Sequence, residues 1–133
     1  MDGLTLAPAD AGVPTGDGIR VGIGGWGFPP WRGRFYPKGL VQRRELEYAS
    51  RQLSAIEING TYYGTQTPAV YAGWREQTPP GFVFTAKAPK RITQARALER
   101  TGPQVEDFVG GIAALEDRLG ALVWQFDAGT RID

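Results

Sequence analysis

The stretch AIEINGTYY at residues 55–63 combines a strand with the edge of a polar site. Side chains alternate along a strand, so Ile56 and Ile58 lie on one face while Glu57 and Asn59 lie on the other. Such a strand needs a helix layer on its apolar side and a polar cleft on its other side. The glycine, threonine and two tyrosines that follow would line the open strand end with hydroxyl groups and rings. The stretch therefore predicts the floor of a site.

Three further segments have the composition of strands, at residues 19–23, 82–87 and 121–126. Helical spacing of apolar residues lies between the strands, at residues 42–53, 68–77 and 101–119. The basic connection after the third strand has room for a short helical turn. The resulting order, βαβαβαβ with crossovers long enough for helices, predicts an α/β fold with one parallel sheet.

Local signals refine two of these helices. The second would begin at a Thr-Pro pair and bury Val70 and Trp74. The third would begin with a capping box formed by Thr101 and Gln104. It would continue to residue 119 on an apolar stripe that includes Val109. Each glycine of the pair at residues 110–111 costs a helix about 1 kcal/mol relative to alanine, so the pair predicts close packing there.

Composition limits the chemistry that 133 residues with no cysteine and no histidine can perform. Thiolate and imidazole metal sites, disulfides and Ser-His triads are excluded, so no metal site is predicted and the cofactor stays open. The net charge of +1 disfavours nucleic acid as a partner. Neither a signal peptide nor an apolar run of membrane-spanning length is present, which favours a cytoplasmic protein without a membrane partner.

The chain divides into one domain and two tails. Residues 1–18 are rich in glycine, alanine, proline and aspartate without apolar periodicity, which predicts a disordered tail. Residues 19–126 hold all the predicted strands and helices. Residues 127–133 are predicted to form a short unstructured tail.

Strand alternation predicts which side chains share the polar face. Glu57 and Lys87 would lie within the distance of an ion pair or of one bridging water. Their strands are consecutive, and alternation places both side chains on the same face of the sheet. The other residues predicted on this face are Gly22, Gly24, Asn59, Thr85 and Gln125. The alternative is a buried structural ion pair whose remaining hydrogen bonds Asn59 and Gln125 satisfy.

Three other features admit two interpretations each. Residues 22–27 spell G-x-G-x-x-G, but the prolines at 29–30 prevent the helix that a dinucleotide site needs, so a tight backbone turn is favoured. The basic run at residues 87–100 would hold phosphate or simply face solvent. The aromatic loop at residues 26–36 would stack on a ligand or cover the core.

Several motifs in this order resemble the YecE-like family of domains of unknown function, over about residues 19–126. They are GWG at 25–27 with Trp31, FYP at 35–37, EINGTYY at 57–63, KAP at 87–89 with Ile92-Thr93, and WQF at 124–126. The resemblance implies a TIM-barrel-like fold with no assigned activity. This chain departs from the family pattern at Gln94, where a histidine is usual, and from Asp127 on, where the family usually has prolines and then a second half of similar length. It is therefore expected to be a truncated member, the amino-terminal half-barrel.

Together these observations favour an enzyme for a small polar or phosphorylated substrate, although whether the chain is an enzyme stays undecided. Glu57 would transfer protons and Lys87 would be its electrostatic partner. The predicted substrate-binding residues are Trp26, Asn59, Tyr62, Tyr63, Arg91 and Gln125. The alternative is a non-catalytic module that grips nucleic acid or a protein partner through residues 87–100 and 26–36.

The half-barrel also predicts how the chain behaves alone. Four strands cannot close a barrel that takes eight, so one sheet face would lack its opposing layer. We therefore expect a chain complete at 133 residues to self-associate or to be loosely packed, and to show no turnover.

Overall fold

The computed structural model of the chain describes residues 18–131, which build a four-stranded sheet in the order β1-β2-β3-β4. All neighbouring strands are parallel, which confirms the predicted βαβαβαβ order. The strands are β1 (Gly22–Gly24), β2 (Ala55–Ile58), β3 (Val83–Lys87) and β4 (Leu119–Val123). The predictions for residues 1–17 and 132–133 lie outside the described residues.

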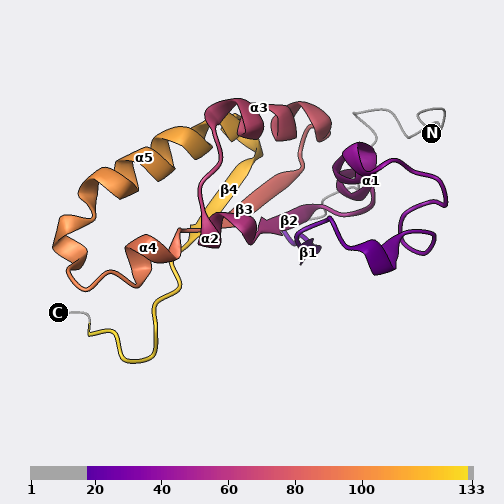
Figure 1. Cartoon of the computed structure of the whole chain (residues 1–133). Coiled ribbons are helices and arrows are strands. Elements are labelled where there is room, and N and C mark those ends of the chain that lie inside the picture. The colour runs from indigo at the N-terminus through magenta and orange to yellow at the C-terminus, as the bar shows by residue number, and fades with distance from the viewer. Residues whose placement is uncertain (1–17, 132–133) are drawn as a thin grey trace.

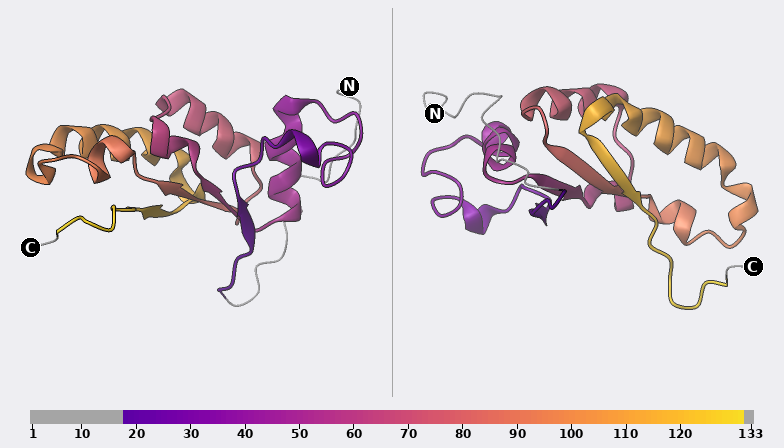
Figure 2. Two further views of the ribbon diagram at one scale, coloured as in Figure 1. Left: turned by 60° about the horizontal axis from the view of Figure 1, so that its bottom comes forward. Right: turned by 180° about the vertical axis from the view of Figure 1, so that it is seen from behind.

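The longer helices cover one face of this sheet. They are α1 (Glu45–Gln52), α3 (Pro68–Gln77) and α5 (Gly102–Ile112). Two one-turn helices, α2 (Gly60–Tyr63) and α4 (Lys90–Thr93), follow the ends of β2 and β3. Short 3-10 turns lie at Pro29–Trp31, Gln42–Arg44, Leu98–Arg100 and Ala113–Arg118. Figures 1 and 2 show α3 and α5 on one side of the strands, whereas no described helix lies across the other side.

Strand alternation sorts the two faces as predicted. Ile56, Ile58, Phe84 and Ala86 are buried on the helix side, and together with side chains from α3, α5 and the turn after α5 they form the core. The alternate residues of β2 and β3 are only half-buried. The uncovered face is therefore the one that carries Glu57 and Lys87.

The first strand is shorter than expected. Ile19 and Val21 are 78% and 67% exposed rather than packed in a core, and the strand begins only at Gly22. Residue 21 is nevertheless held beside the next strand, because its amide donates to Ser54 Oγ at 2.7 Å. The alternation of isoleucine and valine was misleading here, since no described element packs over this edge.

Helix α3 begins as predicted but is rotated. The Thr67 hydroxyl accepts a hydrogen bond from the Val70 amide at 3.3 Å, and Pro68 is the first helical residue. Val70 is 37% exposed, however, and Tyr71 is fully buried in its place. The prediction that Val70 lies on the buried side was wrong, whereas Trp74 does pack against the core.

Helix α5 begins directly after Thr101, as predicted, but its predicted capping box and its predicted length were wrong. The Thr101 hydroxyl donates to the Leu98 carbonyl at 2.6 Å, so it caps no helical amide and there is no capping box. The α-helix ends at Ile112, and a 3-10 turn with a kink at Glu116 leads into β4. β4 consequently starts at Leu119, two residues before the predicted strand.

The glycine pair in α5 does not mark close packing. A Cβ on Gly110 would meet no other atom within 4 Å, and one on Gly111 would make only ordinary contacts with Tyr71 and the Gln66 carbonyl. Val109 is likewise exposed. Val109 and Gly110 therefore face solvent, whereas Gly111 is half-buried beside Tyr71. The fully buried residues of α5 are Phe108 and Ile112.

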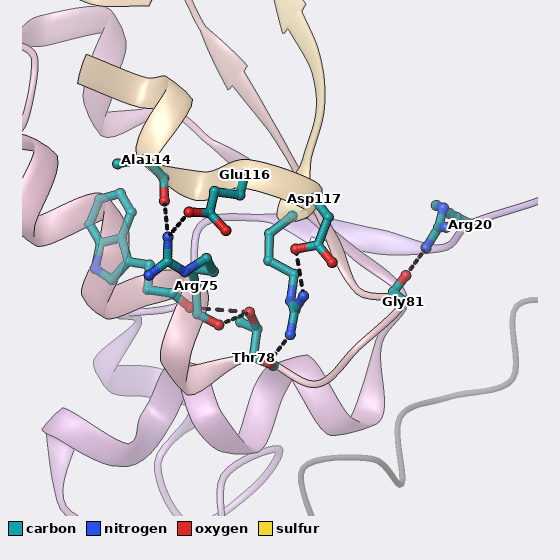
Figure 3. A network of polar contacts seen from close by, with 9 residues as sticks. Arg20, Arg75, Thr78, Gly81, Ala114, Glu116 and Asp117 are labelled. Atoms are coloured by element: carbon teal, nitrogen blue, oxygen red, sulfur yellow. Dashed lines mark hydrogen bonds and ion pairs between the residues drawn. The ribbon is translucent and has the colours of Figure 1, made fainter. Parts of the chain in front are cut away.

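Two arginines attach the turn after α5 to α3 (Figure 3). Arg75 donates to the Ala114 carbonyl at 3.0 Å and pairs with Glu116 at 2.8 Å. Arg118 donates to the Thr78 carbonyl at 3.0 Å. These bonds fix the approach to β4, so they help to place its carboxyl end beside that of β3.

Candidate functional site

Glu57 and Lys87 lie together on the uncovered face, as predicted. The register of β2 and β3 places Glu57 opposite Thr85, one inward position before Lys87. Lys87 Nζ is 4.0 Å from Glu57 Oε1, and the two side chains are 25% and 35% exposed. A half-exposed pair at this distance is a weak ion pair. Both groups keep hydrogen-bonding capacity toward solvent, which distinguishes them from a buried structural pair.

A hollow beside Glu57 lies against the two glycines of β1. It has a volume of about 290 Å³ and is lined by Gly22, Ile23, Gly24, Ala55, Glu57 and Thr85. A Cβ on Gly24 would lie 2.7 Å from Asn59 Nδ2, so only glycine lets the Asn59 amide lie over this strand. Asn59 Oδ1 is buried and accepts no hydrogen bond from the described residues.

Helix α2 attaches the end of β2 to the end of β3. The Thr61 hydroxyl donates to the Lys87 carbonyl at 2.7 Å, and Lys87 Nζ lies 5.9 Å from the centre of the Tyr62 ring. Gln94 Nε2 donates to Tyr62 Oη at 2.7 Å and to Asp127 Oδ1 at 3.3 Å. The sequence prediction included Tyr62 but gave no role to Thr61, Gln94 or Asp127. Only the short-helix fold of residues 60–63 brings these partners together.

Three predicted substrate-binding residues do not contact the Glu57–Lys87 pair through a described hydrogen bond or ion pair. Tyr63 is 75% exposed, with Lys90 Nζ 5.2 Å from its ring centre. Arg91 pairs with Asp107 of α5 at 3.3 Å. Gln125 follows the end of β4 and is exposed. Among residues 18–131, no hydrogen bond or ion pair joins these three side chains to Glu57 or Lys87.

Trp26 lies on the helix side of the sheet. Its ring centre is 5.0 Å from that of Trp74 and 6.0 Å from that of Phe84. The other rings of the aromatic loop also pack against one another and against Tyr48. This packing agrees with the interpretation that the loop covers the core. Its backbone still borders the candidate site, because the Gly25 amide donates to the Glu57 carbonyl at 2.8 Å.

A buried tyrosine in the aromatic loop should make the stability of the chain fall at alkaline pH. Burial raises the pKa of Tyr36 far above its ordinary value, and the neighbouring Glu45 carboxylate adds to the shift. Its hydroxyl donates to the Trp26 carbonyl. Below about pH 10, the ordinary tyrosine pKa, the contribution of Tyr36 to the free energy of unfolding is fully present. Above that pH the unfolded chain loses the hydroxyl proton while the folded chain keeps it, so the stability falls. We expect a loss of about 1.4 kcal/mol per pH unit from this group.

Denaturant titrations between pH 8 and pH 11 would measure this loss. Tyr36→Phe should flatten the alkaline decline, whereas Tyr63→Phe, at an exposed site, should leave it as in the parent chain. Equal slopes for the parent and Tyr36→Phe would contradict the assignment. Burial also raises the pKa of Tyr71, so part of the decline should persist in Tyr36→Phe.

Within residues 18–131 no three side chains among His, Cys, Asp and Glu are grouped so that they could hold a metal ion. No helix in the same range has both the length and the apolar composition that crossing a membrane requires.

Comparison with known proteins places these features in a family. The family model described as "Protein of unknown function DUF72" matches residues 20–133. The UPF0759 protein YecE of Escherichia coli K12 is 31% identical over 110 residues, which are 83% of this chain and 38% of the relative. The chain thus spans less than half the length of the curated relatives that it matches.

Two solved structures share the fold. A DUF72 family protein of Thermotoga maritima superposes with a TM-score of 0.68 at 28% identity, over 86% of this chain and 46% of that one. A DUF72 family protein of Enterococcus faecalis gives a TM-score of 0.51 at 19% identity, over 66% and 38% of the two chains. At that identity the second likeness concerns the fold alone. Both support a partial barrel.

Proposed function

Because the chain belongs to the DUF72 family of proteins of unknown function, we propose a function from its own geometry: one half of an enzyme site for a small polar, phosphorylated substrate. The half-exposed pair of Glu57 and Lys87 is the observation that carries this proposal. It lies on the uncovered sheet face, where the carboxyl ends of parallel strands bind ligands in barrel enzymes.

The two side chains have complementary roles. Lys87 is a compact positive charge with three donors, which suits a phosphate or a developing oxyanion. Glu57 lies 4.0 Å from the ammonium group, close enough to accept a proton from a substrate bound there. Asn59 supplies a buried oxygen without a described donor, and the nearby hollow has room for a small ligand. The three side chains thus offer a positive charge, a proton acceptor and a hydrogen-bond acceptor to a substrate.

The rival module for nucleic acid or a protein partner has less support. It needs the aromatic rings of residues 26–36 on the surface, whereas Trp26 packs against Trp74 and Phe84. One of the basic residues that it would use in residues 87–100, Arg91, already pairs with Asp107. We therefore favour the small-molecule site.

Inorganic phosphate tests the binding part of this proposal. Phosphate should shift the amide NMR signals of residues 57–61 and 85–88 at neutral pH. Lys87→Met should weaken phosphate binding at these residues about tenfold, as expected for one lost charge contact of about 1.4 kcal/mol. Glu57→Gln should strengthen it, because the variant removes a repelling charge beside the anion.

Opposite signs for the two variants separate an electrostatic site from a damaged fold. Lys38→Met is the matched control, since Lys38 is exposed in the loop before α1 and far from β3 in sequence. It should bind phosphate as the parent chain does. Weakening by all three variants alike, or no shift at residues 57–61 and 85–88, would refute the proposed site.

A further inference from the structure

A second cavity lies beyond the carboxyl ends of β3 and β4, apart from the Glu57–Lys87 pair. It is enclosed by the chain that follows α4 and by the segment that follows β4, and its volume is about 700 Å³. The residues that line it and carry the argument are Arg96, Leu98, Glu99, Phe126, Thr130 and Arg131. Pockets of 300–1,000 Å³ accommodate typical small ligands.

The described residues that line this cavity carry more positive than negative charge. Arg96 and Arg131 are exposed side chains, and neither forms an ion pair or side-chain hydrogen bond among the described residues. Among the described residues that line the cavity, Glu99 alone is acidic. Arg91, the nearest arginine before them in sequence, is by contrast taken by Asp107. The two guanidinium groups are therefore available to an anion.

Hydrogen bonds hold the two walls in place. Gln94 in the first wall donates to Asp127 Oδ1 in the second at 3.3 Å. The Thr130 amide donates to the Asp127 carbonyl at 2.9 Å, which closes a turn just before Arg131. Asp127 thus connects both walls, one of which carries Arg96 and the other Arg131. Preorganised walls reduce the entropy lost when a ligand binds.

We propose that this cavity binds a small phosphorylated ligand with a planar ring, in the manner of a nucleoside monophosphate. The planar guanidinium groups of Arg96 and Arg131 match phosphate oxygens in two-point contacts. Phe126 is 36% exposed and Leu98 is half-buried, so together they offer an apolar surface on which a ring can lie. The Thr130 hydroxyl adds a donor on the wall between Phe126 and Arg131.

Isothermal titration of the whole chain with adenosine 5′-monophosphate tests this site. Arg96→Gln and Arg131→Gln should each weaken binding about tenfold, as the loss of one charged phosphate contact implies. Adenosine, which lacks the phosphate, should bind at least about tenfold more weakly than the nucleotide. Phe126→Ser should weaken binding of the nucleotide but not of inorganic phosphate.

Two controls make the result specific. Arg34→Gln removes the same charge from an exposed position in the aromatic loop and should leave binding unchanged. Lys38→Met, at an exposed position in the loop before α1, should also leave it unchanged. No binding of the nucleotide, or equal weakening by Arg34→Gln, would overturn the proposal. So would a single-stranded oligonucleotide that binds far more tightly than the mononucleotide, because it would indicate a nucleic-acid surface instead.

Discussion

Expressed as residues 1–133, the chain should self-associate or behave as a loosely packed species rather than as a compact monomer. Its uncovered sheet face presents Val83, Ala121 and Val123 beside the polar pair, and these positions are half-buried or exposed. A valine left in water forgoes roughly 1.5–3 kcal/mol, against a domain stability of about 5–15 kcal/mol. The outer edges of β1 and β4 also lack a neighbouring strand among the described residues.

Light scattering after size exclusion, over a range of concentrations, would measure this association. Val123→Asp places a charge on the uncovered face and should shift the population toward the monomer. Val109→Asp is the matched control, because Val109 is exposed on α5 and away from that face. A monomeric parent chain with a sharp cooperative melt would contradict the prediction.

Phe84→Ala should remove most of the stability of the chain. Phe84, the second residue of β3, is fully buried, with its ring centre 5.1 Å from that of Phe82 and 6.4 Å from that of Trp74. Truncating a buried phenylalanine typically costs about 3–5 kcal/mol, because apolar contacts are lost and a cavity remains. Urea denaturation at one fixed protein concentration would show the loss as a large fall in the midpoint.

Phe28→Ala is the control for that experiment. Phe28 is 38% exposed, so its truncation should cost much less than that of Phe84. If the two variants lost equal stability, the assignment of Phe84 to the centre of the core would be wrong.

The sheet and the central pair of the site were predictable because they depend on a period of two. Once residues 55–58 and 83–87 are strands, the position of Glu57 relative to Lys87 follows from alternation and from the parallel order. The structure confirms both, with 4.0 Å between the two charged groups. The positions of the residues around Glu57 and Lys87 depend on backbone turns, which strand alternation does not predict.

Three features lay beyond such reasoning for specific physical reasons. Glu45 is fully buried, and its side chain is accommodated because Arg32 Nε, 13 positions earlier in the sequence, lies 3.1 Å from its carboxyl oxygen. No local pattern encodes that pair. The apolar spacing near Val70 fits two helix rotations, and tertiary packing selects the one that buries Tyr71. Helix periodicity also could not show that α5 ends at Ile112.

The proposed site predicts that an anion binds Lys87 beside Glu57. A crystal structure of the chain soaked with inorganic phosphate would show whether it does. We predict phosphate within hydrogen-bond distance of Lys87 Nζ, on the sheet face that no described helix covers. Phosphate bound elsewhere on the chain, while Lys87 and Glu57 contact only each other and solvent, would show that this pair is not an anion site.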